Sequence, residues 1–313
     1  MEITRRNFIK LASIIGLSGV INGIAGCIDN PANVNADGLP PNDEAIVYFS
    51  KNIDAEHLIK LYNKINSDIT GKVGIKINTG EPNSPNIISR DLVKALQAQI
   101  PNSAIVETNT LYEGERFTTE RHRQTLQVNG WTFCPIDILD EDGDIYFTAK
   151  NGLRLKKIYM GSHLEDYDSL VVLTHFTGHT MAGYSGSLKN IATGCASKHG
   201  KQQIYGEDYA PGSSFLERLA DSGKAICDHF GKKIIFINVL QRLSVDCDCI
   251  GMGAAAPDLP DLGMLASTDI LAVEKAALDL IYNFDGEEKD SFIERIQSRA
   301  GLYQLDAMKR LNM

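Results

Sequence analysis

The chain has 313 residues, enough for one large domain or two modest ones with a full hydrophobic core. Hydrophobic residues make up 43% and charged residues 23%, and these values exclude the disordered and fibrous classes. Asp and Glu (40) outnumber Lys and Arg (31), which gives a net charge of −9 and argues against a nucleic-acid-binding protein. Beyond the N-terminus no run of 18 apolar residues occurs, so the sequence predicts no membrane-spanning helix in the body of the chain.

The first segment, residues 1–26, has the pattern of an export signal. Arg5-Arg6 is followed by an aromatic–aliphatic pair and by a moderately apolar stretch that is too short and too rich in Gly and Ser to stay in a bilayer. The stretch ends in Ile24-Ala25-Gly26-Cys27, which resembles a bacterial lipobox. We predict a twin-arginine lipoprotein signal peptide, with Cys27 as the lipidated first residue of the mature protein. The alternative is a chance Arg-Arg pair before a hydrophobic helix.

This signal fixes an expected location and domain plan. Residues 27–44 are rich in Asn, Pro, Asp and Gly and read as a tether, and residues 45–313 form the folded domain. The expected partners are the twin-arginine translocase and the membrane, through lipid on Cys27. The expected location is the outer face of the cytoplasmic membrane or the periplasm. Twin-arginine export moves folded proteins, so its cargo often acquires a cofactor first.

In the body of the chain, short β-branched runs alternate with helical patterns. Several runs are apolar on both faces, as strands covered on two sides would be. Ser89 and Asp269 are placed to cap helices, and the tail from Glu287 has the pattern of an amphipathic surface helix. The alternation predicts an α/β fold with a mainly parallel sheet flanked by helices, in one lobe or two. The expected strands are Ala45–Ser50, Lys72–Ile77, Ser103–Glu107, Phe133–Leu139, Leu155–Tyr159, Leu170–Leu173, Lys233–Leu240 and Gly263–Ala266.

The cysteine count becomes odd once Cys27 is set aside, which excludes a fully paired disulfide framework. Cys134 and Cys227 lie in patterns typical of a buried core. The remaining three lie among Gly, Asp and Lys, where an inert buried thiol is less common; they are Cys195, Cys247 and Cys249.

Ligands of open α/β sheets bind at the carboxyl ends of strands, so the polar segments that follow each apolar run are the candidate sites. Residues 174–201 form the densest such segment, which we expect to be a Gly-rich loop. Its His and Lys side chains offer proton transfer, metal ligation or anion contacts. The alternative is a surface loop whose His and Lys residues are incidental. The histidines and lysines are His175, His179, Lys189, Lys198, His199 and Lys201.

A second candidate segment is Asp246-Cys247-Asp248-Cys249, which mixes hard and soft ligands and suits a transition metal or an iron–sulfur centre. The Cα atoms of a C-x-C pair lie near the limit of disulfide reach, which argues against a bridge between the two thiols. Cys195 or His199 would join this metal site only if the two segments converge. The alternative is an acidic surface with reduced thiols.

The chain resembles the domain-of-unknown-function 362 family, in the branch of uncharacterised iron–sulfur centre proteins, from about Val73 to Ile281. Many members of that branch carry a C-x₂-C-x₂-C-x₃-C run after the Gly-Lys segment. Here the stretch from Lys201 to Lys233 contains only Cys227, so a ferredoxin-type cluster has no ligands. The resemblance rests on residues 74–78, 108–116, 129–131, 174–179, 183–191, 194–197, 200–201, 246–249 and 262–269.

A shorter stretch, His179-x₃-Gly183-Tyr184-Ser185-Gly186-x₂-Lys189, is similar to one found in nickel-pincer lactate racemases. That resemblance implies that His179 is the acid/base and that Lys189 anchors a nickel–pyridinium cofactor. The family's nickel-binding histidine has no counterpart at matching spacing, and His199 is the nearest candidate.

The sequence therefore predicts a metal- or cofactor-binding, enzyme-like domain in which the His/Lys and Asp/Cys segments form one site. One alternative is a non-catalytic iron–sulfur or metal electron-transfer lipoprotein, and another is a binding module that has lost its chemistry. If the domain is enzyme-like, we expect it to bind a small anionic ligand. The candidate catalytic residues are His175, His179 and Lys189; the candidate ligand or cofactor contacts are Lys76, Thr110, Arg116, Gly183, Gly186, Asn190 and Lys201; the candidate metal ligands are Cys195, Asp246, Cys247, Asp248 and Cys249.

Overall fold

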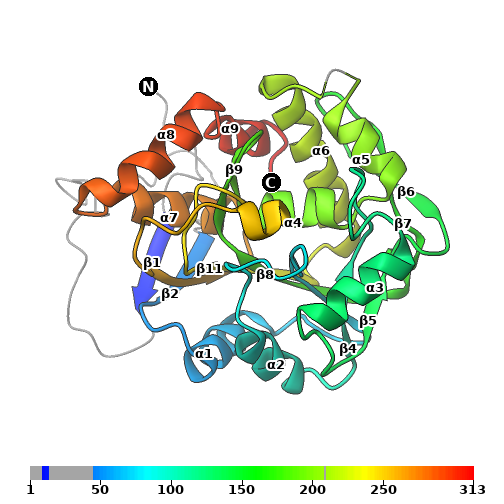
Figure 1. Ribbon diagram of the computed structural model, residues 1–313, viewed down its shortest axis with the longest axis horizontal. Helices are drawn as coiled ribbons and strands as arrows, with labels where there is room; N and C mark the ends of the chain where they lie inside the picture. The colour runs from blue at the N-terminus through cyan, green and yellow to red at the C-terminus, as the bar shows by residue number, and fades with distance from the viewer. Residues whose placement is uncertain (1–8, 14–44, 208) are drawn as a thin grey trace, which may run out of the picture.

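The computed structural model describes residues 9–13, 45–207 and 209–313, and one eight-stranded sheet runs through them (Figure 1). All described strands of this sheet run parallel except the strand 263–267, which is antiparallel to both neighbours. The predicted α/β fold with a mainly parallel sheet is confirmed. The strand order is β1 (Ile9–Ser13), β2 (Ala45–Ser50), β12 (Gly263–Ser267), β11 (Ile234–Leu240), β8 (Ser169–His175), β3 (Val73–Lys76), β4 (Ser103–Glu107) and β5 (Ile136–Ile138).

Helices cover both faces of the sheet, which is why its central strands are apolar on both sides (Figure 1). In β8, Leu170 and Val172 pack into one core while Val171 and Leu173 pack into the other. The first core is closed by α4 (Ser187–Gly194), α6 (Ser213–Phe230), α7 (Ile270–Tyr282) and α9 (Tyr303–Arg310), and the second by α1 (Ala55–Ile65), α2 (Arg90–Ala98) and α3 (Thr119–Val128).

Smaller elements complete the described part of the chain. The tail from Glu287 is not one surface helix as predicted: it forms two helices, and Phe292 and Ile296 of the first are buried against the hairpin of β9 and β10. The remaining elements are β6 (Asp144–Thr148), β7 (Lys157–Gly161), β9 (Thr177–His179), β10 (Gly183–Ser185), α5 (Lys198–Tyr205), α8 (Asp290–Ser298) and the 3₁₀ helices Ser162–Asp166, Asp248–Gly253 and Glu287–Lys289.

The two predicted helix caps differ in the structure. Asp269 precedes α7 and accepts a hydrogen bond from the Ala272 backbone N–H at 2.8 Å, as a capping side chain does. Ser89 precedes α2, but its hydroxyl makes no capping hydrogen bond within the described residues.

Most of the predicted signal peptide, the tether 27–44 and Cys27 lie outside the described residues. The exception is Ile9–Ser13, which pairs in parallel with β2 at the edge of the sheet. Cleavage before Cys27 would therefore leave β2 as the edge strand. None of the helices within the described ranges is both long and apolar enough to cross a bilayer.

Candidate functional site

A cleft opens where several parallel strands reach their carboxyl ends, the usual ligand position in α/β sheets. Lys76, Glu107 and His175 mark the ends of β3, β4 and β8, and all three line the cleft. Its volume is about 100 Å³. Because one buried water needs only roughly 10–15 Å³, the cleft has room for a small molecule.

We expected residues 174–201 to form a loop, but this prediction is wrong. The segment forms the hairpin of β9 and β10, followed by α4 and the start of α5. The carboxylate of Glu274 holds the start of α4, where it accepts hydrogen bonds from the backbone N–H groups of Ser187 and Leu188. Gly186 packs directly on this carboxylate, so a side chain at that position would collide with it. The capped helix carries Lys189 and Asn190 to the cleft wall.

Lys189 is a buried cation that faces the cleft, with 9% of its surface exposed. Its ammonium makes no hydrogen bond or ion pair within residues 45–207 and 209–313. Burial, together with the positive charges of Lys76 and Arg116, lowers the pKa of Lys189 to about 8. An uncompensated ammonium in a cleft is a binding group for an anion.

Two neighbouring cations are paired, in contrast. Lys76 donates to the Glu107 carboxylate at 2.8 Å, and Arg116 donates to Glu81 at 2.8 Å and lies 3.7 Å from Glu107. Burial opposes ionisation of Glu107, but Lys76 and Arg116 outweigh it and hold its pKa at about 2. Gly194 leaves the space through which the Lys76 side chain passes. The Lys76–Glu107–Arg116 group is therefore charged and preorganised at neutral pH.

Lys201 also lines the cleft, and its ammonium donates to three acceptors: the Thr108 hydroxyl at 2.6 Å, the Asn109 carbonyl at 2.6 Å and the Ala196 carbonyl at 2.7 Å. Burial lowers its pKa to about 8. These bonds tie α5 to the segment that follows β4, so Lys201 shapes the cleft as well as charging it.

His175 joins the two predicted segments. Its Nδ1 lies 3.0 Å from both carboxylate oxygens of Asp248, and its Nε2 lies 2.6 Å from the Gln241 carbonyl oxygen. A carboxylate and a carbonyl only accept hydrogen bonds, so both ring nitrogens carry protons in this arrangement. Burial acts against protonation, but Asp248 outweighs it and raises the pKa of His175. With both nitrogens occupied, His175 holds Asp248 in place and is not positioned as a free proton shuttle.

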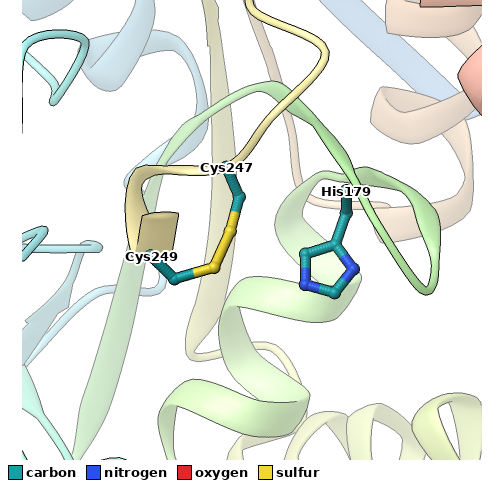
Figure 2. Close-up of side chains that lie close together, drawn as sticks. All are labelled: His179, Cys247 and Cys249. Carbon is teal, nitrogen blue, oxygen red and sulfur yellow. A yellow bond between two sulfur atoms is a disulfide. The ribbon is translucent and has the colours of Figure 1, made fainter. Parts of the chain in front are cut away.

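His179 lies beside Cys247 and Cys249, and one donor atom from each of the three residues lies within 4.8 Å of the others (Figure 2). Its Nδ1 accepts hydrogen bonds from the backbone N–H groups of Met181 and Ala182, at 3.1 and 3.0 Å. Burial, with the cations of Lys189 and Arg295, lowers the pKa of His179 well below its usual range. The neutral ring must then carry its proton on Nε2, and Figure 2 shows a ring nitrogen on the side that faces the two cysteines.

Contrary to the expectation from the C-x-C spacing, Cys247 and Cys249 form a disulfide. The Cα atoms of Cys247 and Cys249 are 5.3 Å apart, inside the range that disulfides span. A disulfide offers no thiolate, and a metal-binding histidine normally donates from its second nitrogen, whereas Nδ1 of His179 accepts. In this form the donor set does not fit a metal ion, and His179 is not among the described residues that line the cleft.

The other predicted residues divide between the cleft and more distant places. Thr110 and Asn190 line the cleft. Asp246 pairs with Arg295 at 3.1 Å, and Cys195 is buried at the end of α4, where burial raises the pKa of its thiol to about 12. Gly183 packs against the turn between α8 and α9, and His199 stacks on Tyr159 at 3.9 Å on an exposed surface. Within the described part of the chain, the predicted site residues that do not line the cleft include Gly183, Gly186, Cys195, His199, Asp246 and Cys247.

Several residues that line the cleft were not predicted as site residues from the sequence. Glu107 was assigned only to a strand, although its position as the last residue before a polar segment marks it as a strand-end group. Asn78 follows β3 in the same way. Tyr205, the last residue of α5, and Tyr209, which lies beyond that helix, stack on each other at 4.7 Å, and no sequence pattern linked them to the cleft.

These features define an α/β domain with a cation-rich cleft at its strand ends. The chain belongs to the family described as domain of unknown function (DUF362), whose model matches residues 73–279. No curated protein matches the chain.

Two solved structures show a distant similarity to this chain. One is the lactate racemase apoprotein from Thermoanaerobacterium thermosaccharolyticum, with 13% identity, a TM-score of 0.41 and coverage of 74% of this chain and 56% of that one. The other is a protein from Thermotoga maritima, with 10% identity, a TM-score of 0.39 and coverage of 84% and 60%. The chain thus spans less than two thirds of the length of either protein.

Proposed function

We propose that this protein is an enzyme-like domain that binds a small anionic molecule, such as a carboxylate, in the cleft at the strand ends. The observation that carries the proposal is the buried ammonium of Lys189, which faces the cleft and has no partner within the described residues. Lys76 and Arg116 support it as a rigid cationic wall fixed by Glu107.

The residues of the cleft would have different roles in binding such an anion. Lys189 would contact the anion, and because its pKa is about 8 it can also exchange a proton near neutral pH. Asn190 and Thr110 would offer further polar contacts on the wall. His175 would act as a positioning residue through its ion pair with Asp248. A role for His179 in proton transfer, which the sequence resemblance implied, would require a change in its present hydrogen bonds.

The experiment is isothermal titration calorimetry with lactate, citrate and sulfate as probes. At pH 7 at least one of them is expected to bind the wild-type chain, and Lys189→Met is expected to weaken that binding at least tenfold. Lys150→Met, which removes a lysine from the exposed surface, is the matched control and should leave the affinity unchanged. Equal affinities in the wild type and Lys189→Met would contradict the proposal.

A metal-holding, non-catalytic protein is the second candidate, favoured by the proximity of His179, Cys247 and Cys249. It would require a reduced dithiol and a different tautomer of His179. Elemental analysis and an absorption spectrum of the natively exported chain decide between the candidates. Stoichiometric metal that is lost in Cys247→Ser would favour this second candidate, and metal-free protein would exclude it.

We further propose that the chain is exported by the twin-arginine route and anchored by lipid on Cys27. The support is the Arg5-Arg6 pattern followed by Ile24-Ala25-Gly26-Cys27. Cys27→Ser is expected to release the protein from the membrane fraction, and Arg5→Lys with Arg6→Lys to retain it in the cytoplasm. Unchanged fractionation of both variants would contradict this assignment.

A further inference from the structure

The surroundings of the Cys247–Cys249 disulfide point to a function separate from anion binding. We propose that this disulfide is a redox-active site, which a dithiol reductant reduces reversibly by entering through the cleft. The inference does not depend on the proposed anion-binding function.

The Cys247–Cys249 disulfide contributes little to the stability of the fold. It joins two cysteines separated by one residue, and the stabilisation from loop closure is smallest for the shortest loops. Cys249 lines the cleft and is partly exposed, whereas Cys247 is 3% exposed and does not line it. A thiolate in the cleft can therefore reach the Cys249 Sγ, with the Cys247 Sγ behind it as the leaving group.

The leaving sulfur lies beside a hydrogen-bond donor. The backbone N–H groups of Met181 and Ala182 occupy Nδ1 of His179, which keeps the proton of the neutral ring on Nε2. That nitrogen faces the disulfide, so Nε2–H can donate to the thiolate that forms on Cys247 (Figure 2). The donor favours the reduced state, since the disulfide accepts hydrogen bonds only weakly.

The exchange balances as follows. One thiolate of the reductant attacks Cys249 Sγ, the S–S bond breaks, and its electron pair goes to Cys247 Sγ. The second thiolate of the reductant then attacks the reductant sulfur of the mixed disulfide, and the electron pair of that bond goes to Cys249 Sγ. The reductant leaves as a disulfide, two electrons have moved to the protein, and the two protons of the reductant end on the new thiols or in solvent.

The test uses the oxidised full chain, equilibrated with mixtures of reduced and oxidised dithiothreitol. Alkylation followed by intact mass spectrometry counts the free thiols, and circular dichroism confirms that the chain stays folded. We expect a single two-thiol transition in the folded protein, absent from the Cys247→Ser, Cys249→Ser double variant. His179→Phe is expected to shift the equilibrium about tenfold toward the disulfide, and His163→Phe, which alters a histidine away from the cysteines, should leave it in place.

Three results would overturn the proposal: free Cys247 and Cys249 thiols in aerobically purified protein, a disulfide reduced only after denaturation, or an equilibrium unchanged in folded His179→Phe. If His179→Phe does not fold, the single cysteine variants decide. Cys249 in Cys247→Ser should react with an aromatic disulfide reagent at least tenfold faster than Cys247 in Cys249→Ser. Equal rates would contradict attack from the cleft.

Discussion

Lys189→Met should make the protein more stable while it weakens anion binding. Lys189 is buried, and its ammonium lacks a partner among the described residues. Methionine has a similar length and no charge, so the variant removes the cost of burying the ammonium and keeps most of the packing.

The size of the effect follows from the pKa of Lys189, which burial and nearby cations lower from 10.5 to about 8. A tenfold change in an ionisation constant is worth about 1.4 kcal/mol, so the protonated side chain destabilises the folded state by about 3 kcal/mol at pH 7. The folded pKa lies below the unfolded one, so this penalty is fully present below pH 8 and fades as the pH rises toward 10.5. At pH 10 about 1 kcal/mol should remain.

Urea denaturation at pH 7 and pH 10 measures both values. Lys189→Met should raise the free energy of unfolding by about 2–3 kcal/mol at pH 7. Lys201→Met is the comparison: burial lowers the pKa of Lys201 to about 8 as well, but its removal leaves the Thr108, Asn109 and Ala196 acceptors without their donor, so it should stabilise the protein less than Lys189→Met does. A Lys189→Met variant less stable than the wild type at pH 7 would refute the reasoning, because it would mean that the ammonium is compensated.

Three further predictions concern the charged groups of the site. Glu107→Gln should lower the free energy of unfolding by about 3 kcal/mol at pH 7 in urea denaturation, because the folded pKa of Glu107 is depressed to about 2. That stability is present above the unfolded pKa of 4.5 and is lost as the pH falls toward 2, so the difference from the wild type should shrink by about 2 kcal/mol at pH 3, whereas exposed Glu56→Gln should show almost none. Asp248→Asn should lower the pKa of His175 in an NMR titration, because burial is then no longer outweighed by a carboxylate. Sulfate, whose charge is constant between pH 7 and 9, should bind more weakly at pH 9 as Lys189 loses its proton; pH-independent calorimetry would contradict this.

The strands of the large sheet from β2 onward were predictable because they are short, largely apolar runs, whereas β6, β9 and β10 were not predicted. Ala45–Ser50 and Ser103–Glu107 agree with the structure at both ends. Helix α4 was missed for a related reason. Residues 187–193 are all buried, so the helix shows no contrast between an apolar and a polar face, and its Ser, Asn and Thr residues imitate a loop.

The sequence predicted some of the residues that line the cleft, but not the hydrogen-bond and ion-pair partners of those residues. The rule that ligands bind at the carboxyl ends of strands brought Lys76, Arg116 and Lys189 into consideration, and all three line the cleft. Which acceptor each side chain meets depends on packing between segments far apart in sequence. The bond between Cys247 and Cys249 depends on the local backbone path, which a C-x-C pattern does not specify.

The charge balance of the cleft constrains its ligand. The cations of Lys76 and Arg116 are matched by Glu107 and Glu81, and His175 is matched by Asp248. Lys189 and Lys201 remain without an ion pair among the described residues, and only Lys201 has hydrogen-bond acceptors, in a chain whose overall net charge is −9. The net charge therefore does not favour long-range attraction of an anion, and recognition must come from the local field of the cleft, which burial strengthens. A ligand with one negative group near Lys189 would give this ammonium its missing partner, whereas a neutral or cationic ligand would leave the ammonium buried without compensation.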